Sequence, residues 1–150
     1  MPQSLSNVIL HIIFSTKSRE PWLGPAVRPR MHAYLATICR DLNAELVRVG
    51  GMADHVHIVT TLPRTISQAE IVEETKKTSS KWIKALDEGY RAFCWQRGYA
   101  AFSVSPSQLG SVLKYVEDQA THHRRRSFQE EYREILEKHG IHFDERYVLD

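Results

Sequence analysis

The chain has 150 residues, a hydrophobic fraction of 42% and a formal net charge of +2. These values predict a single globular domain over residues 1–150 and exclude both a polycation and a disordered chain. Two widely separated cysteines, Cys39 and Cys94, argue against a disulfide scaffold or a cysteine zinc site and favour a reducing cytoplasm. The apolar run at residues 8–14 is too short to span a bilayer and lacks signal-peptide features, so we expect no membrane partner.

The first half of the chain predicts three strands and one helix. Residues 7–14 are rich in β-branched and aromatic side chains and predict a buried strand. Apolar residues at helical spacing predict a helix over residues 30–42. Strands at 45–49 and 54–62 follow, and Gly50-Gly51 between them predicts the turn of a hairpin.

The second half predicts a strand and three helices. Ser67 and Glu70 form a capping box that opens a helix to about residue 86, and a strand follows at 99–104. Ser105-Pro106, with a glutamine two residues on, predicts a second helix start. Ser127 with Glu130 predicts the cap of a last short helix.

The order strand, helix, strand, strand, helix, strand is that of the split βαβ, or ferredoxin-like, domain. We therefore expect an α+β fold of the RNA-recognition type. Its mainly antiparallel four-stranded sheet should carry helices on one face, with further helices appended at the C-terminus. The core should cover about residues 7–122, and residues 127–150 should form a helical tail.

A pair of histidines is the first candidate site. Side chains at i and i+2 of a strand point to the same face, so His55 and His57 should project together while Val56 packs behind them. Neutral imidazoles bind divalent metals, and Asp54 could orient one ring through its second nitrogen. Such a pair is also frequent by chance, and two histidines on a solvated sheet face need not bind anything.

The helix after the last strand carries the second candidate site. Tyr115 and Gln119 lie one turn apart, at the border of an apolar face formed by its leucines and valines. From there they could lean over the sheet and meet a ligand. The commoner role for such a border tyrosine is to extend its hydroxyl to water.

Clusters of basic residues could grip a phosphate backbone, although a charge run is usually a solvated face. One group lies on the second predicted helix and another directly follows the tyrosine helix. The candidate nucleic-acid-binding residues are Lys17, Arg19, Lys77, Lys81, Arg124, Arg125 and Arg126.

Five blocks, in order and at similar spacing, make the chain resemble the small single-tyrosine HUH transposases of bacterial insertion sequences and their relatives associated with repeated palindromic elements. The resemblance covers most of residues 7–122. The blocks are His11-Ile12-Ile13-Phe14-Ser15-Thr16-Lys17, Asp54-His55-Val56-His57-Ile58, Lys77-Thr78-Ser79-Ser80-Lys81, Gly98-Tyr99 with Ser103-Val104, and Tyr115-Val116-Glu117-Asp118-Gln119.

The resemblance implies a Mg²⁺ or Mn²⁺ ion held by His55, His57 and Gln119, with Tyr115 as the nucleophile. It implies single-stranded DNA with a nearby hairpin as the substrate, cleaved and rejoined through a 5′-phosphotyrosine during DNA transposition. It also implies a homodimer in which each tyrosine could serve the partner's histidines. The protein would then be a bacterial cytoplasmic enzyme that acts at the nucleoid.

Three other functions stay open at this point. A domesticated nuclease could process chromosomal hairpins without moving an element, and the sequence does not separate it from a transposase. A non-catalytic binder of the RNA-recognition type would need none of the two histidines, the tyrosine and the glutamine. A zinc hydrolase is disfavoured because no third His, Cys or acidic residue has a persuasive spacing to the histidine pair.

Overall fold

The structure is a computed structural model that describes residues 2–119, 127–144 and 146. Its centre is a four-stranded antiparallel sheet in the order β2-β3-β1-β4. The strands are β1 (Ile9–Ser15), β2 (Val47–Met52), β3 (His55–Thr61) and β4 (Ala100–Val104). The two central strands, β1 and β3, therefore have hydrogen-bonded neighbours on both sides.

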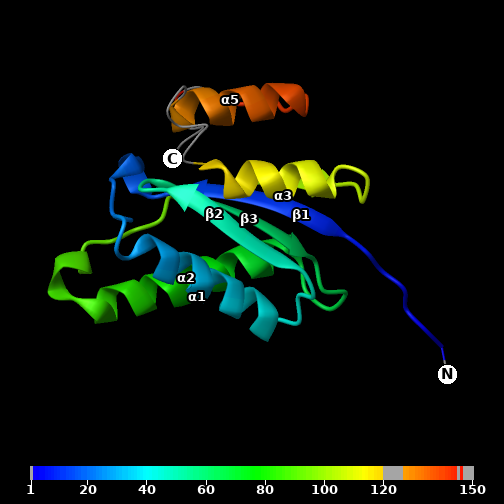
Figure 1. The fold of residues 1–150 in the computed structure, drawn as a ribbon, viewed down its shortest axis with the longest axis horizontal. Coiled ribbons are helices and arrows are strands. Elements are labelled where there is room, and N and C mark those ends of the chain that lie inside the picture. The colour runs from blue at the N-terminus through cyan, green and yellow to red at the C-terminus, as the bar shows by residue number, and fades with distance from the viewer. Residues whose placement is uncertain (1, 120–126, 145, 147–150) are drawn as a thin grey trace.

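Helices cover both faces of this sheet (Figure 1). The long helices α1 (Arg28–Asp41) and α2 (Gln68–Leu86) lie side by side on one face. On the other face lie α3 (Leu109–Glu117) and α5 (Phe128–Lys138). Short 3-10 turns, η1 (Lys17–Arg19) and η2 (Glu88–Tyr90), follow β1 and α2. Within the described residues, no helix is both long enough and apolar enough to cross a membrane.

The alternation of side chains along β1 divides the interior into two layers. Leu10, Ile12 and Phe14 join the main apolar core under α1 and α2. Ile9 and Ile13 point to the opposite face, where they belong to smaller apolar clusters with α3 and α5 respectively. The smaller clusters leave room between them for polar side chains, and the candidate site lies there.

The predicted fold is confirmed: the strands, their order along the chain and the helices agree with an α+β domain of the split βαβ type. Both capping boxes form. The Oγ of Ser67 accepts a hydrogen bond from the Glu70 amide at 3.1 Å, and the Oγ of Ser127 accepts one from the Glu130 amide at 3.3 Å. These local signals work because a capping hydroxyl satisfies an amide that the helix itself cannot pair.

The prediction of a turn at Gly50-Gly51 is wrong. Both glycines lie inside β2, and the turn is at Ala53 and Asp54. A Cβ at Gly50 would collide with the carbonyl oxygen of Val116 and lie 2.9 Å from its Cγ1, so this glycine lets α3 approach the sheet.

The prediction of a helix start at Ser105-Pro106 is also wrong. Residues 106–108 form a turn and α3 begins at Leu109. The Oγ of Ser105 lies 3.1 Å from the Oγ of Ser107, and the Ser105 carbonyl accepts from the Gln108 amide at 3.0 Å. The serine therefore stabilises this turn instead of capping the helix.

Candidate metal centre and nucleophile

The two predicted histidines stand together in the interior. His55 and His57 are both fully buried on β3, on the face that α3 and α5 cover. Their ring centroids lie 5.1 Å apart at an interplanar angle of 76°. Val56 points the other way into the main core, as the strand periodicity requires.

Each of these histidines has a partner at its Nδ1 atom. The Nδ1 of His55 lies 2.8 Å from Oδ1 of Asp54, and the Nδ1 of His57 lies 2.8 Å from Nε2 of His11. Burial, reinforced by the adjacent His57, lowers the pKa of His11 to about 3, so His11 is neutral at pH 7. A neutral His11 can accept an N–H from His57, and Asp54 can accept one from His55, which leaves both Nε2 lone pairs available.

Both Nε2 atoms face oxygens from the C-terminal part of the chain. The Nε2 of His55 lies 3.1 Å from Oε1 of Gln119, and the Nε2 of His57 lies 2.9 Å from Oε1 of Glu131. The amide nitrogen of Gln119 donates to the carbonyl of Tyr115 at 3.2 Å, which turns the amide oxygen towards His55. If His55 donates to Asp54, its Nε2 and the Gln119 oxygen are both acceptors, and they can approach this closely only around a proton or a cation.

The buried donors suit a divalent cation. One ligand atom from each of His55, His57 and Glu131 lies within 4.8 Å of the other two, so this group could hold a metal ion. Gln119 adds an amide oxygen beside it. Two imidazole nitrogens with amide and carboxylate oxygens form a donor set that suits a divalent metal ion such as Mn²⁺, so the residues fit the cation that the resemblance implies.

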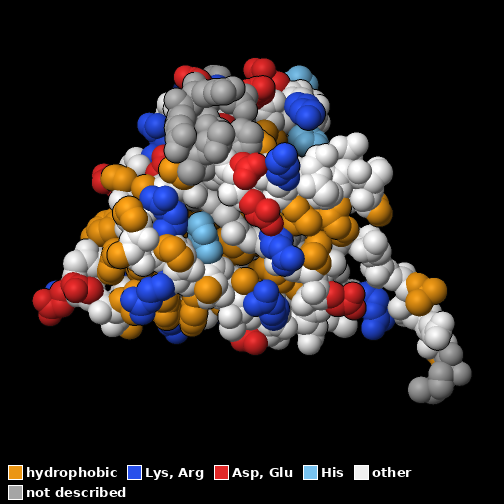
Figure 2. Space-filling model, viewed as in Figure 1, with side chains coloured by type: hydrophobic (Ala, Val, Ile, Leu, Met, Phe, Trp, Pro, Cys, Tyr) orange, Lys and Arg blue, Asp and Glu red, His pale blue; other side chains and the backbone are white. Residues whose placement is uncertain are grey.

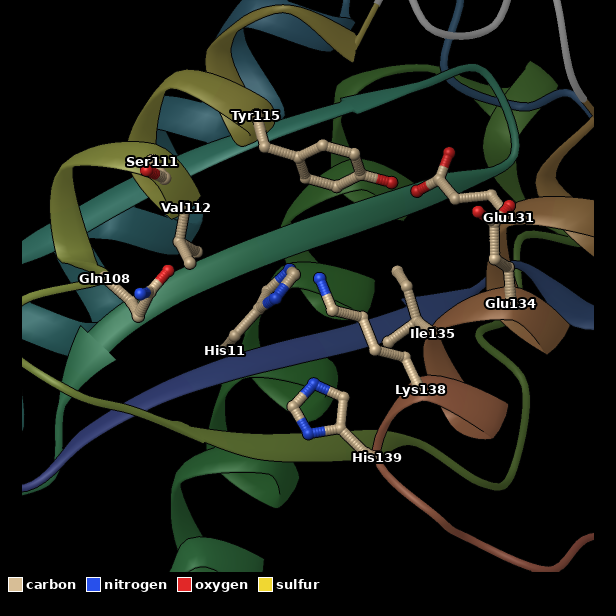
Figure 3. A pocket seen from close by; sticks show the side chains of 10 residues that line it. All are labelled: His11, Gln108, Ser111, Val112, Tyr115, Glu131, Glu134, Ile135, Lys138 and His139. Atoms are coloured by element: carbon tan, nitrogen blue, oxygen red, sulfur yellow. The ribbon is translucent and has the colours of Figure 1, made fainter.

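Tyr115 lies beside this cluster. It projects from α3, its ring centroid lies 5.7 Å from that of His57, and the two rings meet edge to face at 81°. Its ring also lies 6.4 Å from that of His11. The hydroxyl of Tyr115 and the carboxylate of Glu131 point towards each other across the gap between α3 and α5 (Figure 3). The structure thus brings the predicted tyrosine to the predicted histidines within one chain.

A cavity of about 320 Å³ opens next to Tyr115. His11 is part of its wall, α3 contributes Ser111 and Val112, and α5 contributes Ile135 and Lys138 (Figure 3). The cavity therefore connects the histidine cluster with a surface that carries both apolar and charged side chains.

The basic residues predicted to bind nucleic acid are divided between two faces. Lys17 and Arg19 are exposed in η1, directly after the end of β1 that pairs with His55. The Arg19 guanidinium also contacts α5, because the Gln129 carboxamide, oriented with its oxygen towards it, accepts at 2.9 and 3.1 Å. These two cations therefore lie at the histidine end of the sheet.

Lys77 and Lys81 lie on α2, across the sheet from the histidines, and Lys77 pairs with Glu74 at 2.9 Å. On the face of the molecule that Figure 2 shows, basic side chains are interspersed with acidic and apolar ones. Arg124, Arg125 and Arg126 lie outside the described residues.

Two residues of the cluster, His11 and Glu131, were not predicted as part of the site. No third His, Cys or acidic ligand was predicted because none has a persuasive spacing to the histidine pair along the sequence, and Glu131 reaches His57 from a helix 74 positions further along the chain. A local signal for Glu131 exists: it occupies a position on the buried stripe of α5, between Phe128 and Tyr132. Spacing within the sequence says nothing of what that stripe packs against.

Comparison with known proteins identifies the family and the fold of the chain. The chain matches the model of the family described as Transposase IS200 like over residues 4–119. No curated protein matches. A crystal structure of a candidate transposase from Deinococcus radiodurans R1 superposes with a TM-score of 0.61 at 21% identity, covering 79% of this chain and 98% of that one.

A second solved structure, a REP-associated tyrosine transposase bound to a REP hairpin, has a TM-score of 0.60 at 14% identity. That comparison covers 82% of this chain and 72% of the other. At these identities the two structures show a common fold. The family match spans most of the chain and includes both histidines, the tyrosine and the glutamine. The chain belongs to the IS200-like transposase family.

Proposed function

We propose that this protein cleaves and rejoins single-stranded DNA during transposition, with Tyr115 as the nucleophile. The observation that carries the proposal is the position of Tyr115 next to a buried histidine pair. The ring centroids of Tyr115 and His57 are 5.7 Å apart. A binding module of the same fold would have no use for a buried pair of imidazoles facing an amide and a carboxylate.

The proposed step is an exchange of phosphate esters. The Tyr115 oxygen attacks the phosphorus, the bond from phosphorus to the 3′-oxygen breaks, and the phenolic proton is lost as the 3′-oxygen gains one. The products are a 5′-phosphotyrosine and a free 3′-hydroxyl. Because the number of ester bonds is unchanged, another 3′-hydroxyl can reverse the step and join new ends without ATP.

A phenol is a weak nucleophile at neutral pH, so the step needs assistance. His55, His57 and Gln119 would hold a Mg²⁺ or Mn²⁺ ion, with Asp54 and His11 fixing the imidazoles through Nδ1. When bound, such an ion polarises the scissile phosphate and neutralises the charge that develops on it.

The proposed substrate is a DNA strand with a hairpin near the cleavage site. Two features support it: the similarly folded transposase solved with a REP hairpin, and the exposed cations Lys17 and Arg19 at the histidine end of the sheet. The cavity beside Tyr115 would receive the nucleotides that flank the scissile phosphate.

The decisive test is covalent adduct formation with a panel of single-stranded hairpin oligonucleotides and Mg²⁺ or Mn²⁺, read on a denaturing gel. Tyr115→Phe should abolish the adduct and keep hairpin binding, since only one oxygen is lost. Tyr132→Phe is the matched control, because Tyr132 is buried in α5 and burial raises the pKa of its phenol to about 12. It should keep the adduct.

Excess chelator and His57→Ala should also remove the adduct. Undiminished cleavage by Tyr115→Phe would refute the nucleophile, and cleavage that survives the chelator would refute the metal. Hairpin binding without any adduct from the unmodified protein would favour a non-catalytic binder.

A further inference from the structure

Helix α5 presents an acidic residue where its sequence pattern calls for an apolar one. Phe128, Tyr132 and Leu136 are buried against the sheet, and Glu131 shares their stripe at 1% exposure. Among the residues that the structure describes, Glu131 is the only acidic side chain that is buried. A carboxylate at such a position costs desolvation free energy, which a positive partner must offset.

The apolar contacts of α5 aim this carboxylate at the histidine pair. The Phe128 ring stacks on His55 with centroids 4.1 Å apart and an interplanar angle of 19°. One helical turn further on, Oε1 of Glu131 lies 2.9 Å from Nε2 of His57. Adjacent ligands around an octahedral Mg²⁺, each about 2.1 Å from the ion, are about 3.0 Å apart. The distance from His57 Nε2 to Glu131 Oε1 is 2.9 Å, and that from His55 Nε2 to Gln119 Oε1 is 3.1 Å. Both distances are therefore close to the spacing of adjacent ligands around such an ion.

We infer that Glu131 is a further ligand of the divalent cation, and that metal binding and the seating of α5 on the sheet are thermodynamically linked. This inference rests on the metal site of the proposed function. It adds a residue that the family match does not reach, because that match ends at residue 119. The metal site would then be assembled from the sheet and from the C-terminal helix.

Linkage follows from the geometry of the two halves. The two histidines lie on β3 and Gln119 lies two residues after the end of α3, whereas Glu131 is part of α5. An ion that binds Glu131 gains affinity only while α5 is seated, so by reciprocity the ion must stabilise the seated helix by the same factor.

The competing explanation gives the opposite sign. Glu131 could simply pair with a protonated His57 in the metal-free protein, in which case the ion would have to displace it. Removing the carboxylate charge would then tighten metal binding and would not weaken it.

Calorimetric titration with Mn²⁺ separates the two explanations, using Glu131→Gln and, as a matched control, Glu137→Gln. Glu137 is on the same helix and is exposed. Loss of an outer-sphere partner already costs about 10- to 100-fold in metal affinity. The Glu131→Gln protein should therefore bind Mn²⁺ at least tenfold more weakly, and Glu137→Gln should bind like the unmodified protein. Unchanged or tighter binding by Glu131→Gln would overturn the inference.

Hydrogen exchange tests the linkage itself and requires no activity. Addition of Mn²⁺ should slow amide exchange in residues 128–138 of the unmodified protein and of Glu137→Gln, but not of Glu131→Gln. Faster exchange on addition of Mn²⁺ would mean that the ion expels the helix. If the unmodified protein binds no Mn²⁺, or if His57→Ala binds it equally well, the metal site of the proposed function is refuted. If Mn²⁺ binding depends on His57 but not on Glu131, only the present inference is refuted.

Discussion

At the scale of single residues, the contact between His11 and His57 decides which ring nitrogen of a neutral His57 carries the proton. Their ring nitrogens are 2.8 Å apart and the rings stack at 5.1 Å. An acceptor at Nδ1 keeps the proton there and leaves the Nε2 lone pair for a metal. In the proposed metal site, His11 would thus be a positioning residue.

His11→Leu should therefore weaken Mn²⁺ binding by about 10- to 100-fold, because it removes the acceptor and keeps similar bulk. His11→Gln should retain most of the affinity, since its amide oxygen can reach a similar place and accept the same N–H. Calorimetry measures both affinities, and thermal unfolding without metal provides the control for packing damage. Equal loss in both variants, matched by equal loss of stability, would mean that His11 is only a packing residue.

The residues of the site were predictable to the extent that their signals are local. His55 and His57 followed from strand periodicity, which depends on backbone geometry alone. The prediction that one helix carries both Tyr115 and Gln119 is wrong in its boundary, because α3 ends at Glu117. Gln119 still lies one turn beyond Tyr115, and its side-chain nitrogen donates to the Tyr115 carbonyl at 3.2 Å. The assignment of roles to them came from the resemblance. Glu131 and His11 join the cluster through tertiary contacts over tens of residues, which no local period encodes.

At the scale of elements, the contact of β2 with α3 sets the position of Tyr115, the proposed nucleophile. Val116, the residue after Tyr115, lies so close to Gly50 that a Cβ at position 50 would collide with it. Gly50→Ala should destabilise the fold by about 1–3 kcal/mol, as overpacking does, and should displace Tyr115 from the histidines. Adduct formation should then fall more than hairpin binding.

The control for this substitution is Gly110→Ala on α3, where an added Cβ meets nothing within 4 Å. An alanine there should be neutral or should stabilise the helix by about 1 kcal/mol. Thermal unfolding and the adduct gel measure both variants. A Gly50→Ala protein with unchanged melting temperature and unchanged cleavage would contradict this account of the close approach.

The elements themselves were predicted best where a cap marks the boundary. Ser67 and Ser127 cap the first turns of α2 and α5, because each hydroxyl accepts a hydrogen bond from the amide three residues further on. The glycine pair misled because two glycines just before Ala53-Asp54 look like a turn. In the structure Gly50 allows the close approach of α3, and a Cβ at Gly51 would meet the backbone of His55 and Val56 on β3. Only knowledge of the tertiary contact distinguishes these two uses of glycine.

At the scale of the whole molecule, the two faces of the sheet have different roles. The α1 and α2 face holds the main apolar core, and the α3 and α5 face holds the buried polar cluster (Figure 1). Single-stranded DNA that reaches Tyr115 must therefore approach the second face. Lys17 and Arg19 are placed to meet it, whereas Lys77 and Lys81 could contact only a hairpin that extends around the sheet.

Replacing Lys17 and Arg19 together by alanine should lower the slope of log K against log salt by about 1.4 for an unstructured single strand, or about 0.7 for each lost phosphate contact. Replacing Lys77 and Lys81 by alanine should leave the slope for an unstructured strand unchanged. The same replacement should lower the slope measured with hairpin DNA. Filter binding at several salt concentrations measures both. Equal effects of the two double variants on an unstructured strand would refute this division of the faces.

The last prediction concerns whether one chain completes its own site. The resemblance implies a dimer with exchanged tyrosines, yet Tyr115 already lies beside His57 of the same chain, with ring centroids 5.7 Å apart. We therefore expect that mixing a His57→Ala protein with a Tyr115→Phe protein, co-expressed so that heterodimers can form, yields no covalent DNA adduct. A site shared across a two-fold axis would behave differently, because each heterodimer would then contain one intact composite site and one doubly defective site. Adduct formation by the mixture, with neither parent active alone, would show that the tyrosine acts on the partner's histidines and that α3 takes another position in the assembled enzyme.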